Sequence, residues 1–250
     1  MPDWFTSWKT LTVFKNKKDT IKSNYMTATF IEDVQVYWIN HASVKLDGSK
    51  RIYIDPFSDT FTKKYDKADI IIATHPHFDH FDPKAIKELS NDECVLVAKK
   101  GCDIGQFDFE ARIINPDEKH FVKGVSIKSI HAYNDKRFRN PGEPFHPRGE
   151  GMGVVIEMDG TKIYHSGDTD MIGEMKALEK EEIDVALLPI GGTYTMDIKE
   201  AVEAVKTIKP HTVIPIHYNM LSNTEADPKE FKRKVESTTD TNVIILEPDS

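Results

Sequence analysis

Short apolar runs separated by turn-forming residues dominate the chain from residue 34 onward. Runs of about four to eight residues rich in Val, Ile and Leu are typical of buried β-strands. We expect strands at 34–38, 43–46, 51–54, 69–73 and 94–98 in the first half, and at 125–130, 153–158, 162–165, 183–188 and 212–216 in the second.

Three segments between these runs have apolar residues at helical spacing. Two begin with Asp-Pro pairs, at 82–83 and 227–228, where Asp fits the N-cap and Pro fits the first helical position. The third begins at Asp197, where Glu200 would complete a capping box, and ends before Pro210. No Gly-, Ser- or Pro-rich linker divides the chain, so we expect one domain over residues 34–250.

Residues 1–33 have a different pattern of residue types from the rest of the chain. Aromatic residues, among them Trp4, Phe5 and Trp8, stand at helical spacing beside a row of lysines that includes Lys9 and Lys15. We expect an N-terminal arm that packs on the domain or on a second subunit of a homo-oligomer. Contact with a membrane surface is the alternative interpretation.

Composition narrows the function classes. A formal net charge of -8 and a pI near 5.7 argue against binding to a phosphate backbone, which depends on clustered Lys and Arg. We therefore expect a small-molecule substrate and no nucleic acid. The chain has only two cysteines, no signal-peptide pattern and no apolar run approaching the roughly 18 residues of a membrane span. These features favour the cytoplasm and exclude a membrane span.

The most informative motif is the run that follows the strand at 69–73. His75, His77, Asp79 and His80 place three imidazoles and a carboxylate within six residues. Imidazole nitrogen and carboxylate oxygen are the donors that Zn²⁺ and similar ions take in proteins. The spacing therefore predicts a metal site, and the number of donors favours a two-metal hydrolase.

Other ligand-type residues follow strands far away in the sequence. His131 follows the strand at 125–130, Asp168 follows the strand at 162–165, and His217 follows the strand at 212–216. If those strands lie side by side, their ends meet along one edge of a sheet, where distant residues can converge on one site.

This constellation resembles the metallo-β-lactamase fold superfamily. The resemblance rests on His75-x-His77-x-Asp79-His80, on Gly167-Asp168-Thr169 and on His217. Segments 55–56, 132–134, 145–147, 164–170, 187–196 and 216–218 look like the branch that contains L-ascorbate-6-phosphate lactonase. The resemblance implies an α+β fold, a four-layer αββα sandwich, and two bound metal ions.

The resemblance also implies a role for each motif residue. His75 and His77 would bind the first metal, Asp79 and His80 the second, Asp168 would bridge both, and His217 would complete the second site. The first metal needs a third imidazole, for which strand-end geometry favours His131 and the resemblance favours His146. We expect His146, with His131 as the alternative.

Two further histidines have open roles. His41 lies at a turn after a strand. It could hydrogen-bond a metal ligand, or it could have a purely structural role. His165, just before Ser166, is a second candidate for such a supporting role.

The function expected from these features is hydrolysis of a small, anionic molecule, a lactone or phosphoester, by a hydroxide that bridges two divalent ions. Zn²⁺ suits the nitrogen-rich set, and Mn²⁺ or Fe²⁺ also fits. Asp79 is the candidate catalytic residue because it could orient the water. Candidate substrate-binding residues are Asn134, Arg148 and Tyr194. The alternatives are a metal-dependent nuclease of the same fold and a non-catalytic metal-binding module.

Overall fold

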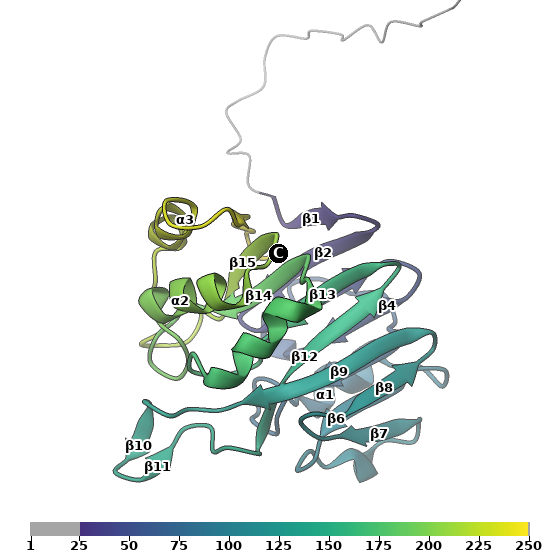
Figure 1. The fold of residues 1–250 in the computed structure, drawn as a ribbon. Coiled ribbons are helices and arrows are strands. Elements are labelled where there is room, and N and C mark those ends of the chain that lie inside the picture. The colour runs from purple at the N-terminus through teal and green to yellow at the C-terminus, as the bar shows by residue number, and fades with distance from the viewer. Residues whose placement is uncertain (1–25, 250) are drawn as a thin grey trace, which may run out of the picture.

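Two seven-stranded sheets face each other in the computed structural model, which describes residues 26–249 (Figure 1). The first sheet consists, in order, of β1 (Ala28–Ile31), β2 (Val34–Asn40), β3 (Ser43–Asp47), β4 (Arg51–Ile54), β5 (Ile70–Ala73), β6 (Val95–Lys99) and β7 (Ala111–Ile114). The second consists of β16 (Asn242–Val243), β15 (Thr212–Ile216), β14 (Val185–Pro189), β13 (Thr161–His165), β12 (Gly151–Met158), β9 (Val125–Ala132) and β8 (Lys119–Val122).

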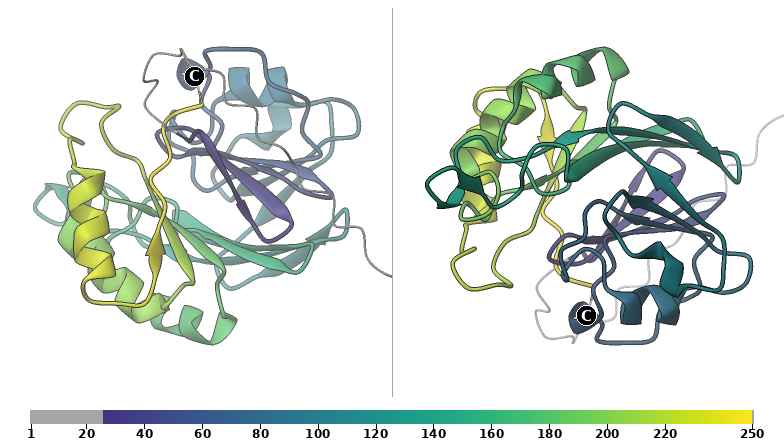
Figure 2. Two further views of the ribbon diagram at one scale, coloured as in Figure 1. Left: turned by 90° about the horizontal axis from the view of Figure 1, so that it is seen from above. Right: turned by 90° about the horizontal axis from the view of Figure 1, so that it is seen from below.

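Helices cover the outer face of each sheet (Figure 2). Helix α1 (Pro83–Leu89) packs on the first sheet, and the second is covered by the 3₁₀ helix η3 (Gly173–Glu181), α2 (Ile198–Ile208) and α3 (Pro228–Glu236). Short 3₁₀ turns, η1 (Ser58–Thr60) and η2 (Ile104–Gln106), and a small hairpin of β10 (Phe138–Asn140) and β11 (Glu143–Pro144) complete the structure. The predicted four-layer αββα sandwich is confirmed.

Strand β5 shows why the apolar runs are continuous instead of alternating. It lies between β4 and β6 and pairs in parallel with both. Ile70 and Ile72 point into the core between the sheets, whereas Ile71 and Ala73 pack beneath α1. A strand buried on both faces needs apolar residues at every position.

Capping side chains fix where the helices begin. Asp82 accepts a hydrogen bond from the Lys84 backbone N–H at 2.8 Å, and Asp227 accepts one at 2.9 Å from the equivalent N–H in α3. Asp197 and Glu200 form the predicted capping box of α2. The helix predictions are confirmed at all three starts.

The structure adds elements that the sequence pattern did not predict. Strands β7 and β8, the hairpin and η3 carry few buried apolar residues, so their periodicity is weak. Strand β1 begins at Ala28, inside the segment 1–33 that we assigned to the arm, and pairs with β2 at the edge of the first sheet. The aromatic and basic stripes of the arm lie outside the described residues.

The parallel strands bring the ends of several elements to one edge of the sandwich. Strands β13, β14 and β15 run parallel in the second sheet, as β4, β5 and β6 do in the first. The sheets are joined at this edge, since the His217 backbone N–H donates to the His41 carbonyl at 2.8 Å. Within residues 26–249, no helix has the length and apolar character needed to cross a membrane.

Candidate metal centre

The loop after β5 carries four of the predicted ligands in a tight turn. The backbone N–H of His80 donates to the carbonyl of His77 at 3.0 Å, which closes the turn. The side chains of His75, Asp79 and His80 are buried, whereas Phe78 between them is 68% exposed. The turn therefore directs the ligand-type side chains inward and one aromatic ring outward.

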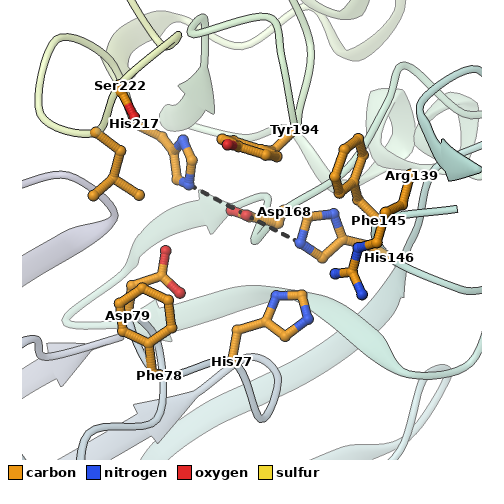
Figure 3. A pocket seen from close by; sticks show the side chains of 11 residues that line it. His77, Phe78, Asp79, Arg139, Phe145, His146, Asp168, Tyr194, His217 and Ser222 are labelled. Atoms are coloured by element: carbon orange, nitrogen blue, oxygen red, sulfur yellow. Dashed lines mark ion pairs between the residues drawn. The ribbon is translucent and has the colours of Figure 1, made fainter.

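Ligand atoms from separate parts of the chain gather in two groups that share no residue, and a third set, His75, His80 and Asp168, takes one histidine from each of them. Within each set, the ligand atoms all lie within 4.8 Å of one another. The first group is His75, His77 and His146. The second group is His41, Asp79, His80 and His217. Figure 3 shows His77, His146, Asp79 and His217 from these groups, together with Asp168, around one hollow.

Asp168 lies between the two groups. Its Oδ2 atom is 3.3 Å from His146 Nε2 in the first group and 3.2 Å from His217 Nε2 in the second (Figure 3). Its Oδ1 atom is 3.4 Å from His80 Nε2. One carboxylate therefore faces ligand atoms of both groups, the position that a bridging ligand must occupy.

The backbone conformation of Gly167 allows Asp168 to lie between the two groups. Gly167 has φ +60°, and a Cβ atom there would lie 2.4 Å from the Met152 carbonyl oxygen. Only glycine fits so close to a neighbouring strand in this conformation. His41, Asp55 and His217 also have positive φ values, 51°, 46° and 55°. Such conformations cost free energy in residues with side chains and cluster at functional sites.

Buried hydrogen bonds orient the imidazoles of the β5 loop. Asp55, fully buried at the end of β4, accepts from Thr74 N–H at 2.8 Å and from Thr74 Oγ1 at 2.7 Å. The second carboxylate oxygen of Asp55 also lies 2.7 Å from His80 Nδ1, and Thr74 Oγ1 lies 3.0 Å from His75 Nδ1. Both rings are thus held by Nδ1, which leaves the Nε2 atom of His75 facing His77 and that of His80 facing Asp168, as is usual for metal-binding histidines.

Asn134 orients His146 in the same way. Its Oδ1 atom accepts from the His146 backbone N–H at 2.9 Å and lies 2.8 Å from His146 Nδ1. The Asn134 amide donates to Asp170 Oδ1 and to the Tyr194 carbonyl, both at 3.0 Å. One buried amide therefore connects a candidate ligand with the loop after β14.

Electrostatics at the site favour a neutral imidazole at His75 and a charged carboxylate at Asp168. Burial, aided by the neighbouring His80, holds the pKa of His75 well below its usual range. Burial would raise the pKa of Asp168, but His217 and His80 outweigh it and hold that pKa well below its usual range. Metal binding requires these protonation states.

His80 is surrounded by carboxylates. Burial would lower its pKa, but Asp168 and Asp55 outweigh burial and hold that pKa well above its usual range. Asp79 Oδ2 lies 3.7 Å from His80 Nε2. The negative charges that favour a proton on this ring would equally favour a divalent cation in its place.

The residues present fit a metal ion. Buried nitrogens without a hydrogen-bond partner among the described residues include His80 Nε2, His217 Nε2 and His41 Nδ1. A buried polar atom without a partner is costly, and three at one site call for a ligand that this protein chain does not itself provide. Nitrogen donors next to carboxylates are a set that Zn²⁺ accepts.

A family model described as a beta-lactamase superfamily domain matches residues 35–217, which is most of the described chain. The chain belongs to the metallo-β-lactamase superfamily. The family resemblance of the motifs is therefore confirmed, although the matches do not single out the ascorbate-6-phosphate lactonase branch.

Relatives within this superfamily extend over nearly the whole domain. UPF0173 metal-dependent hydrolases from Pelotomaculum thermopropionicum and Thermococcus onnurineus are 38% and 37% identical over 222 and 230 residues, covering 86% of this chain and 97% of each relative. Among solved structures, the metallo hydrolase Igni18 from Ignicoccus hospitalis is 28% identical with a TM-score of 0.73, covering 87% of this chain and 96% of Igni18.

The metallo-β-lactamase fold brings most of the predicted site residues together, but not all of them. His146 lies with His75 and His77, whereas His131 belongs to neither group and lies 3.4 Å from Asp117. Side chains alternate along β9, and the His131 ring points to the face that carries Asp117. Strand-end position alone was therefore a poor guide to the third imidazole.

The three predicted substrate-binding residues are placed differently. Tyr194 lines the cavity beside the ligands, whereas Asn134 supports His146 from behind. Arg148 is not among the residues that line the cavity and pairs with Glu174 at 2.7 Å. Arg139, which the sequence gave no reason to prefer over its neighbours, does line it.

The sequence reasoning did not give Asp55 or Thr74 a role. Asp55 directly follows β4 and Thr74 directly follows β5, and the two strands are parallel neighbours. An acidic residue directly after a strand was the available signal. Its meaning depended on knowing that β4 and β5 are adjacent.

We expect His146→Ala to weaken metal binding at the first group more than His131→Ala does. Removing a ring of the first group should cost more than the roughly 10- to 100-fold typical of losing an outer hydrogen-bond partner. His131→Ala, the matched control, should leave metal affinity close to that of the wild type. Competitive metal titration of both variants measures this, and a larger loss in His131→Ala would reverse the assignment.

Proposed function

We propose that this protein is a metal-dependent hydrolase that holds two divalent cations and cleaves a small anionic substrate, a lactone or a phosphoester. The observation that carries the proposal is the position of Asp168, with one oxygen close to a ring nitrogen of each ligand group. The names of the relatives also support hydrolysis that depends on a metal.

His75, His77 and His146 would hold the first cation, and Asp79, His80 and His217 the second, with Asp168 between them. Two such cations would lower the pKa of a water in the cavity and stabilise negative charge that develops on the substrate. Zn²⁺ suits this set of donors best, and Mn²⁺ or Fe²⁺ could take the same positions.

Asp79 is the candidate for orienting the water. His41 Nε2 lies 2.9 Å from Asp79 Oδ2 and fixes the carboxylate, which also lines the cavity. The His80 charge and the His41 hydrogen bond outweigh the effect of burial and hold the pKa of Asp79 below its usual range. The carboxylate is therefore charged at neutral pH and a weak base, which suits it to binding a cation and orienting a water more than to accepting a proton.

Thiol chemistry is not an alternative for the described residues. Cys94 and Cys102 are both buried and free. Burial raises the pKa of each thiol to about 12, so the thiolate is scarce at neutral pH.

We expect protein purified without chelator to contain about two transition-metal ions per chain, because the side chains provide two sets of donors. Elemental analysis measures the content. The metal-loaded protein is then screened against lactones, phosphodiesters and phosphorylated sugars, with chelator-treated protein as the control. A metal content near zero after reconstitution with Zn²⁺ and Mn²⁺ would refute the proposal.

A further inference from the structure

The cavity beside the candidate ligands is lined by two chemically different sets of side chains. Its volume is about 490 Å³, within the usual range for small-molecule sites. One set consists of the candidate ligands His77, Asp79, His146, Asp168 and His217. Three aromatic rings and a leucine, Phe78, Phe145, Tyr194 and Leu221, also line the cavity. Figure 3 shows Phe145 near Tyr194 and Arg139, whereas Phe78 lies beside Asp79.

The aromatic rings are held in place by other rings. Phe145 and Tyr194 meet edge to face with their centres 5.0 Å apart, and Phe78 packs edge-on against Phe57 at 5.8 Å. Phe78 nevertheless remains 68% exposed at the mouth of the cavity. A bound molecule with a flat apolar body would cover this surface and gain free energy from its burial.

Arg139 is the one Lys or Arg side chain among the residues that line the cavity. It lies on β10, and Figure 3 shows it entering beside Phe145 and His146. Its guanidinium carbon is 5.7 Å from the centre of the Phe145 ring. Its ion-pair contact with Glu143 is long, 4.0 Å, and its side chain is 58% exposed.

The neighbouring arginines form ion pairs with acidic residues outside the cavity. Arg137 pairs with Asp170 at 2.5 Å and with Glu200, and is only 13% exposed. Arg148 pairs with Glu174 at 2.7 Å. Arg139 is therefore the guanidinium of this region that is free to pair with a ligand.

We propose that the cavity binds an anion with an aromatic body, whose charged group pairs with Arg139 while its ring lies against Phe145, Tyr194 and Phe78. This inference rests on the proposed function, because the bond to be cleaved must reach the candidate ligands. With two divalent cations bound, the positive charge would exceed that of the two carboxylates among them. An anion is then favoured in this cavity although the chain as a whole is acidic.

A pair of matched aromatic lactones tests the inference, phthalide-5-carboxylate and its neutral carboxamide. Metal-loaded wild type should favour the carboxylate in kcat/KM by at least about tenfold, as expected for a charge-assisted hydrogen bond. Arg139→Gln should bring the ratio of the two kcat/KM values close to one, mainly through KM, with Arg139→Lys in between. Arg148→Gln, the matched control, should keep the wild-type ratio.

Binding of the corresponding lactams, which lack the labile ester, provides a readout independent of turnover. Isothermal titration calorimetry should show tighter binding of the lactam carboxylate, lost in Arg139→Gln, whereas Phe145→Leu should weaken the binding of both lactams. Arg139-dependent binding without lactone hydrolysis supports this inference and removes lactones from the proposed function. Hydrolysis with no preference for the anion, or no lactam binding to the wild type, overturns the inference and leaves the hydrolase proposal intact.

Discussion

Asp168→Asn is expected to leave the protein folded while removing most of its activity and part of its metal. The amide keeps the shape of the side chain but loses the negative charge that would lie between two cations. Turnover of any identified substrate should fall by at least about tenfold, the low end for a disturbed metal shell. Activity and elemental analysis measure the effect, and circular dichroism should match that of the wild type.

Asp240→Asn is the matched control, because this aspartate is exposed and remote from the metal centre. It should keep full metal content and full activity. If Asp168→Asn does the same, Asp168 is not a ligand, and the roles proposed for the two groups fail. If Asp168→Asn loses its circular dichroism signal, the loss of activity reflects unfolding. The metal affinity of the folded fraction is then compared with that of the wild type.

The part of the site that could be predicted from sequence is the part encoded locally. His75, His77, Asp79 and His80 come from one turn, so their spacing alone placed them together. Strand patterning was equally local, since an apolar run such as Ile70–Ala73 must be buried wherever it lies. The four layers then followed from the family resemblance and not from the pattern.

Residues that depend on the packing of distant segments were harder to predict. Strand-end position favoured His131 and the family resemblance favoured His146. The choice between them depends on which way the His131 side chain points from β9. His41 reaches Asp79 across 38 positions in sequence, at the end of a hairpin that no local motif marks. Arg139 lies on a small hairpin whose strands have no apolar alternation.

Asp55→Ala is expected to destabilise the fold as well as the site. Asp55 is fully buried and accepts hydrogen bonds from Thr74 and His80, so its loss leaves buried donors without a partner. Its φ of 46° is also less costly for Asp than for Ala. The free energy of unfolding should fall by about 3–5 kcal/mol, the range for breaking a buried charged pair. The melting temperature should fall by roughly 6–20 °C at about 2–4 °C per kcal/mol.

Asp55→Asn separates the two roles of this residue. The amide can still accept from the Thr74 N–H and tolerates the positive φ, so stability should fall less than in Asp55→Ala. Its NH₂ group would face His80 Nδ1, however, and metal affinity should fall by about 10- to 100-fold, as for other partners of ligand histidines.

Asp227→Ala is the control, because it removes only the α3 cap. It should lower the free energy of unfolding by about 0.5–2 kcal/mol and leave the metal content unchanged. Chemical denaturation measures the stability of the three variants, and metal titration measures their metal affinity. Wild-type metal affinity in Asp55→Asn would mean that Asp55 supports the fold without orienting His80.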